Sequence, residues 1–164
     1  FALVGVAVGT EAGVNSALVY MMIYLIMTLG TFACILQMRR DGRYVESIGE
    51  LAGLSRERPT LALILAVCMF SLAGIPPLPG FVAKFLIFRN VIAAGHTLYA
   101  VAGLVGSYLG IYFYLRVIQL MFMSEERPAI AHARPGTLAV GAALACLAAA
   151  VVLGVYPASM LGRF

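Results

Sequence analysis

The chain has 164 residues, of which 63% are hydrophobic and only 11% are charged, and its formal charge is +4 at pH 7. Because soluble domains carry roughly 25% charged residues, this composition excludes an ordinary soluble domain and predicts an all-α polytopic membrane protein. The arginines lie mainly in short links between apolar segments, and no RNA- or DNA-binding motif is present, so we expect no nucleic-acid partner.

The first stretch, residues 1–10, is apolar but too short to cross about 30 Å of hydrocarbon. No basic region precedes it, as one does in a signal peptide. We therefore expect it to be the end of a preceding helix. On this interpretation residues 1–164 form a single transmembrane domain, the C-terminal part of a longer subunit.

A charge-free stretch from Ala12 to Met38 contains the first complete span. Residues 11–15 contain a glycine, so we expect a short turn there. A transmembrane helix over residues 16–38 would be long enough to cross the hydrocarbon. The polar link 39–58 follows it.

The next apolar segment, residues 59–94, is longer than the roughly 20 residues that a straight transmembrane helix needs. Prolines inside a helix remove backbone donors and clash with the preceding turn. We expect two half-helices, 59–73 and 80–94, joined by an irregular bridge of the kind that frames ion sites in transporters. The residues that break the helix are Gly74, Pro76, Pro77, Pro79 and Gly80.

Lys84 is the only lysine of the chain and lies just after this bridge. A lysine at membrane depth is costly and is a functional-site hypothesis by default. A lysine removed from water can give up its proton, whereas an arginine stays protonated. We interpret Lys84 as a proton-transfer residue beside a path lined by the bridge. The alternative is a side chain that reaches out to the membrane surface.

Two further spans, residues 98–123 and 137–155, are separated by the polar link 124–136. Links 39–58 and 124–136 contain most of the arginines. Cytoplasmic loops of membrane proteins carry an excess of basic residues. The sequence therefore predicts that both links lie in the cytoplasm.

One face of the span 98–123 carries Tyr108, Tyr112 and Arg116 at four-residue spacing. Tyrosines are enriched where a membrane helix meets the interface, so we interpret this face as an aromatic anchor. The alternative is a polar file, that is, a row of hydrated polar side chains, beside Lys84.

Cys34, Cys68 and Cys146 each lie inside an apolar segment and far apart in the sequence. This spacing fits neither a metal site nor a disulfide framework, so we expect them to be small packed core residues. No nucleotide-binding glycine motif is present. The sequence predicts no cofactor and no metal in this chain.

Four stretches of the chain are distinctive: YLIMTLGTFACILQMRR (24–40), IGELAGLSRERP (48–59), FSLAGIPPLPGFVAKFLIF (70–88) and SYLGIYFYLRVIQLMF (107–122). They resemble the antiporter-like membrane subunits of bacterial respiratory complex I, the NADH-quinone oxidoreductase, and among them subunit N. Together they cover most of residues 16–123, in the order and spacing of the family.

The resemblance implies half of an antiporter-like inverted-repeat fold, a helical bundle with one discontinuous, proline-broken transmembrane helix. It implies that Lys84 matches the proton-translocating lysine, and that the subunit couples NADH-to-quinone electron transfer to proton pumping. It also implies the bacterial inner membrane as location, with other membrane-arm subunits of complex I and the lipid bilayer as partners. NADH, FMN, iron–sulfur clusters and quinone would be bound by other subunits, and this chain would carry no redox centre.

Two alternatives stay open. A subunit of a multisubunit sodium/proton antiporter is built on the same repeats, although residues 30–40 and 48–59 favour complex I. A structural membrane subunit would instead hold Lys84 in an inert ion pair.

Overall fold

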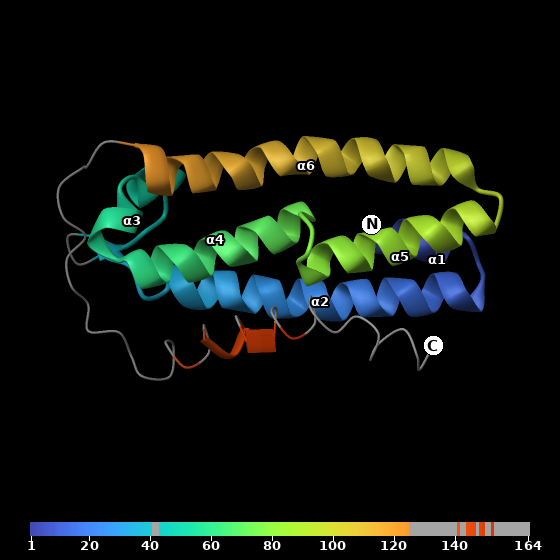
Figure 1. Ribbon diagram of the computed structural model, residues 1–164, viewed down its shortest axis with the longest axis horizontal. Helices are drawn as coiled ribbons and strands as arrows, with labels where there is room; N and C mark the ends of the chain where they lie inside the picture. The colour runs from blue at the N-terminus through green and yellow to red at the C-terminus, as the bar shows by residue number, and fades with distance from the viewer. Residues whose placement is uncertain (41–42, 125–140, 142–143, 147, 150–151, 153–164) are drawn as a thin grey trace.

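The computed structural model describes residues 1–40, 43–124, 141, 144–146, 148–149 and 152, and they form an elongated helical bundle (Figure 1). The elements in chain order are α1 (Ala2–Ala7), α2 (Glu11–Ile35), β1 (Arg39–Arg40), β2 (Arg43–Tyr44), η1 (Ile48–Leu51), α3 (Leu54–Glu57), α4 (Pro59–Ala73), α5 (Pro79–Ala93) and α6 (Thr97–Met123). The predicted helical bundle with one broken helix is confirmed.

The two halves of the broken helix, α4 and α5, lie end to end in the middle of the bundle (Figure 1). The continuous helices α2 and α6 run along opposite sides of them, and each contacts both halves. The short helix α1 packs against α2 and α5. The break is therefore enclosed between two unbroken helices.

Within the described part of the chain, α2 and α6 are each long and apolar enough to cross a membrane, by length and composition. The half-helices have 15 residues each, and at about 1.5 Å per residue neither reaches across about 30 Å alone. End to end they cover the length that one continuous helix would need. Of the predicted link 124–136 only Ser124 is described, and of the predicted span 137–155 only residues 141, 144–146, 148–149 and 152 are described.

The start of α2 differs from the prediction, because the helix already begins at Glu11. Thr10 caps it, since its side-chain oxygen accepts a hydrogen bond from the Gly13 N–H at 3.1 Å. The acidic Glu11 also favours the positive end of the helix dipole. The predicted turn over residues 11–15 is therefore wrong, and the chain turns at Gly9, where φ is +68°.

The other end of α2 differs as well, since the helix ends at Ile35 rather than at residue 38. The chain then forms the hairpin β1–β2, in which Arg39 pairs with Tyr44 in antiparallel register. The N–H groups of Gln37 and Met38 bond to carbonyls three residues back along the chain, not four as in an α-helix, so the helix ends before the hairpin begins. The link 39–58 contains this hairpin, η1 and α3.

This link also packs against the bundle. Leu51 and Leu54 are buried in one core cluster with Met121 of α6. The Gly53 N–H donates to the Leu120 carbonyl at 3.3 Å. The link therefore joins the start of α4 to the end of α6 at one end of the bundle.

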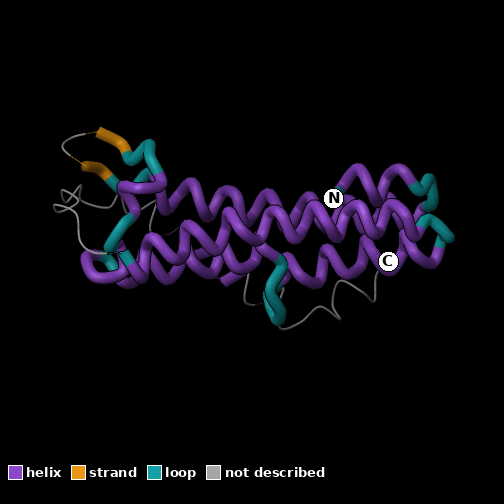
Figure 2. Tube along the Cα trace, turned by 90° about the horizontal axis from the view of Figure 1, so that it is seen from above, coloured by secondary structure: helices purple, strands orange, loops and turns teal. Residues whose placement is uncertain are grey.

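The break between α4 and α5 has the expected turn chemistry. Gly74 ends α4 with φ +87°, in the left-handed region that favours glycine, and its N–H donates to the carbonyls of Phe70 and Ser71. Pro79 lies in the first turn of α5, where a missing N–H costs no helix bond. The bridge 75–78 extends from the side of the bundle as a loop (Figure 2).

The two half-helices approach closely where α5 begins. A Cβ atom at Gly80 would collide with the backbone carbonyl of Ser71, so the approach requires glycine. The Gly80 N–H also donates to the Ser71 hydroxyl oxygen at 3.2 Å. The break is therefore a packed joint that fixes the start of α5 against the end of α4.

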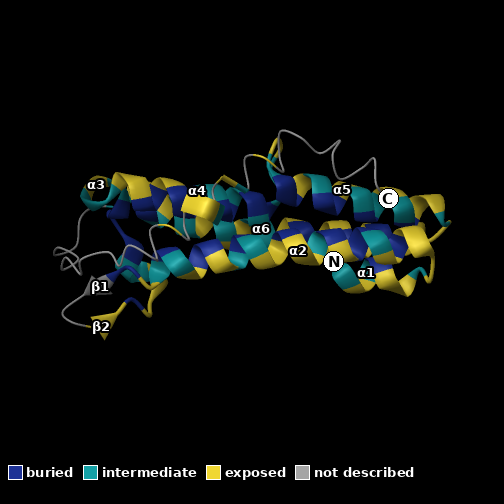
Figure 3. Ribbon diagram, turned by 90° about the horizontal axis from the view of Figure 1, so that it is seen from below, coloured by how far each residue is buried: buried dark blue, intermediate teal, exposed yellow. Residues whose placement is uncertain are grey.

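Buried residues lie mainly on the inner faces of the helices, and exposed residues lie mainly on the outer faces (Figure 3). Cys34 and Cys68 are fully buried free thiols, which confirms the prediction of core residues for these two, whereas Cys146 is half-buried. A Cβ atom at Gly30 would lie 3.2 Å from Cys68 Sγ, so the small residue lets the sulfur pack against α2.

Candidate functional site

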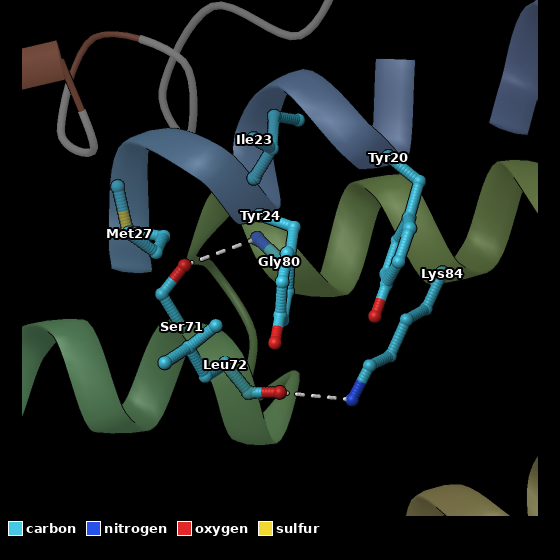
Figure 4. A pocket seen from close by; sticks show the side chains of 8 residues that line it. All are labelled: Tyr20, Ile23, Tyr24, Met27, Ser71, Leu72, Gly80 and Lys84. Atoms are coloured by element: carbon cyan, nitrogen blue, oxygen red, sulfur yellow. Dashed lines mark hydrogen bonds between the residues drawn. The ribbon is translucent and has the colours of Figure 1, made fainter. Parts of the chain in front are cut away.

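Lys84 lies in the second turn of α5 and points back toward the end of α4 (Figure 4). Its side chain is buried, with 7% of its surface exposed. The Nζ atom donates to the carbonyl oxygens of Leu72 at 3.0 Å and Ala73 at 2.9 Å, and to the Ser107 hydroxyl at 3.2 Å. An ammonium group has three N–H donors and no acceptor, so these three oxygens satisfy it completely.

The prolines of the bridge explain why two of these acceptors are free. In a continuous helix the carbonyls of Leu72 and Ala73 would accept from the N–H groups four residues later. Those positions are Pro76 and Pro77, which have no N–H. The same prolines that break the helix therefore leave two carbonyls that Lys84 binds.

No carboxylate among the described residues contacts Lys84, whose polar partners there are two backbone carbonyls and one hydroxyl. The Phe1 ring adds a further neutral contact, with its centroid 4.9 Å from Nζ, where a cation is attracted to the ring face. The C-terminal end of α4 also carries a partial negative charge. The described partners of Lys84 therefore hold its positive charge by dipoles.

A small pocket adjoins this site. Figure 4 shows two tyrosine side chains of α2, Tyr20 and Tyr24, extending into the space near Leu72 and Lys84. Their rings are stacked, with centroids 6.1 Å apart and an interplanar angle of 19°. The remaining lining residues are Ile23 and Met27 of α2, Ser71 of α4 and Gly80 of α5.

The bridge residues that the sequence singled out all lie at the break beside Lys84. A Cβ atom at Gly74 would lie 3.0 Å from Lys84 Cδ and from its Nζ. Gly74 therefore leaves room for the lysine, and Gly80 lets the two half-helices meet. Pro76 and Pro77 lack the N–H groups that would otherwise bond to the carbonyls of Leu72 and Ala73. Pro79 lies in the first turn of α5.

The structure does not bring Tyr108, Tyr112 and Arg116 to Lys84. Tyr108 and Tyr112 are 78% and 62% exposed in this chain, and Arg116 is exposed as well. The predicted alternative of a polar file beside Lys84 is therefore not the arrangement seen, because this face of α6 points away. The aromatic-anchor interpretation stays a prediction.

Sequence reasoning missed Ser107, which lies one residue before Tyr108. Successive residues of a helix are about 100° apart, so the two side chains occupy different faces. A signal was available, since α6 buries Ala100, Gly103 and Ser107, small residues that recur at helical spacing. Such residues let helices approach closely in membranes, and Ser107 is the polar member of this set.

The chain is similar to several known proteins along most of its length. Residues 1–110 match the family described as NADH:quinone oxidoreductase/Mrp antiporter, TM. NADH-quinone oxidoreductase subunit N of Beijerinckia indica is 50% identical over 161 residues, which cover 98% of this chain and 33% of that protein. NADH-quinone oxidoreductase subunit N 1 of Rhizobium meliloti is 53% identical over 128 residues, 77% of this chain and 27% of that protein.

Solved structures give the same result. A chain of respiratory complex I from Thermus thermophilus superimposes with a TM-score of 0.74 at 33% identity, covering 88% of this chain and 33% of that one. A chain of the Mrp complex from Dietzia sp. superimposes with a TM-score of 0.79 at 25% identity, covering 98% and 38%. The chain thus spans about a third of the length of these relatives. It belongs to the NADH:quinone oxidoreductase/Mrp antiporter family of transmembrane proteins, and its curated relatives are subunits N of NADH-quinone oxidoreductases.

Proposed function

We propose that this chain is part of a proton-translocating membrane subunit of a bacterial NADH-quinone oxidoreductase, in which Lys84 takes up and releases the proton. Electron transfer from NADH to quinone takes place in other subunits of the complex, which bind NADH, FMN, the iron–sulfur clusters and quinone. This chain contributes a proton site and carries no redox centre.

The observation that carries the proposal is the neutral set of acceptors around Lys84 Nζ. Removing one partner of a buried ion pair leaves an uncompensated charge, which is strongly unfavourable. A lysine held by carbonyls and a hydroxyl can lose its proton without that penalty. The site also lies at the break of a helix in the middle of the bundle, where irregular backbone lets polar groups and water reach membrane depth.

The inert ion-pair alternative requires a carboxylate beside Lys84, and no described residue supplies one. The antiporter alternative shares this fold, since the Mrp complex superimposes on 98% of the chain. The fold therefore does not separate the two kinds of transport. The 50% identity to a subunit N over 98% of the chain favours NADH-quinone oxidoreductase.

We further propose that the subunit lies in the bacterial inner membrane, among other membrane-arm subunits, with the link 39–58 in the cytoplasm. This link contains five arginines, and basic loops face the cytoplasm. It contacts the end of α6, after which the link 124–136 begins. Both links then leave the same end of the bundle, as the predicted orientation requires.

The experiment that tests this function purifies the tagged, full-length subunit from its native membrane. We expect NADH–quinone reductase activity and flavin and iron–sulfur absorption in the purified material, and NADH-driven proton movement in sealed vesicles that does not depend on sodium. Purified material without NADH oxidation, but with sodium-dependent proton exchange, would contradict the proposal and support the antiporter.

A further inference from the structure

The hydrogen bonds of Lys84 suit the ammonium form, but proton release changes what the nitrogen needs. A neutral amine has two N–H donors and one lone pair that accepts. The carbonyls of Leu72 and Ala73 can only accept, so they serve the two remaining N–H groups and cannot serve the lone pair. Among the described partners, only the Ser107 hydroxyl can also donate.

Ser107 differs from two other buried hydroxyls, those of Ser16 and Thr31, in how it is bonded. Ser16 donates to the Gly13 carbonyl at 2.8 Å, and Thr31 donates to the Met27 carbonyl at 2.9 Å, each within its own helix. Within the described part of the chain, the hydroxyl of Ser107 bonds instead to Lys84, 23 residues away in the sequence. Its side chain is 9% exposed, so an unused hydroxyl there would carry a desolvation cost.

We propose that Ser107 is a positioning residue whose hydroxyl serves both protonation states of Lys84. It accepts a hydrogen bond from the ammonium. When Lys84 releases its proton to a water molecule, the hydroxyl rotates about its Cβ–Oγ bond and donates to the lone pair of the amine. The inference rests on the proposed function, because it requires Lys84 to release a proton.

The arrangement also gives α6 a hydrogen bond to Lys84 whose donor depends on whether the lysine is protonated. The carbonyl contacts of Lys84 come from α4, which precedes it along the broken helix, and the hydroxyl contact comes from α6. The donor in the α6 contact is the lysine in one state and the serine in the other. Neither state then leaves a buried polar group unpaired, which would otherwise cost stability.

The test uses three variants of the full-length subunit in the intact complex: Ser107→Ala, Ser107→Thr and Ser107→Val. Threonine keeps a hydroxyl, and valine has nearly the same shape as threonine but no hydroxyl. We expect Ser107→Ala and Ser107→Val to assemble but to lower NADH-driven proton pumping by about three- to tenfold, the size expected for one lost intramolecular hydrogen bond of ordinary strength. Ser107→Thr is expected to restore most of the rate.

Ser16→Ala is the matched control, because it removes a buried hydroxyl that does not contact Lys84, and it is expected to pump normally. Equal pumping by the threonine and valine variants, or wild-type pumping by Ser107→Ala, would overturn the inference. Failure of all three Ser107 variants to assemble would also overturn it, since the serine would then be structural. Normal pumping by Lys84→Met would refute the proposed function itself, which keeps the two failures distinguishable.

Discussion

Lys84→Arg is expected to abolish NADH-driven proton pumping, although the variant keeps a positive charge at the same position. Arginine has a pKa above about 12 and is effectively never deprotonated in proteins. The guanidinium donates to carbonyl oxygens as the ammonium does, so we expect the complex to assemble. The rate of pumping in sealed vesicles is expected to fall by at least about a hundredfold, the lower end of the range for a lost proton-transfer group.

The control is Arg89→Lys on the same helix. Arg89 is exposed and five residues beyond Lys84, so exchanging one basic residue for the other there is expected to leave pumping unchanged. If Lys84→Arg assembles and pumps at the wild-type rate, the site needs a fixed positive charge and not a proton carrier. That result would support the inert, structural lysine.

Gly80→Leu is expected to prevent stable packing of the broken helix. Even a Cβ atom at this position would collide with the backbone of Ser71, and the backbone of α4 cannot move aside as a flexible side chain would. Overpacking of this kind costs roughly 1–3 kcal/mol or more. Because Lys84 lies one turn further along α5, a shift of that helix also moves Nζ away from Leu72 and Ala73. We expect a lower melting temperature of the purified complex and reduced pumping.

Gly106→Ala is the matched control for this prediction. A Cβ atom at Gly106 meets no atom of the described chain within 4 Å, and alanine is favoured over glycine in a helix by about 1 kcal/mol. The control is expected to leave the melting temperature unchanged or slightly higher. If the Gly80→Leu complex has the same melting temperature as the wild-type complex, the close approach of the half-helices is not needed for stability.

The broken helix was predictable because its causes are local. Two consecutive prolines flanked by glycines cannot continue a helix, and the structure ends α4 at Ala73 and begins α5 at Pro79, close to the half-helices 59–73 and 80–94. The sequence also indicates which carbonyls lack a helical partner. Leu72 and Ala73 precede Pro76 and Pro77 by four residues, and proline has no N–H to donate.

The start of α2 and the α6 side of the site were not predicted, for different reasons. Gly13 favours a turn over residues 11–15, whereas Thr10 is a favourable N-cap residue and is the stronger signal. The partner of Lys84 on α6 depends on how two helices pack, which periodicity alone does not determine. The sequence pattern pointed to the side chains of Tyr108 and Tyr112, but the hydroxyl of the neighbouring Ser107 contacts Lys84.

The most direct test of the central claim is the number of protons translocated per NADH oxidised by the intact complex that carries Lys84→Met. Methionine is a flexible side chain of similar length, so it retains much of the packing but cannot carry a proton. The account predicts normal assembly with pumping lost, either alone or together with quinone-reductase turnover. Unchanged assembly, turnover and proton-to-NADH ratio would contradict it and show that Lys84 is dispensable for proton transfer.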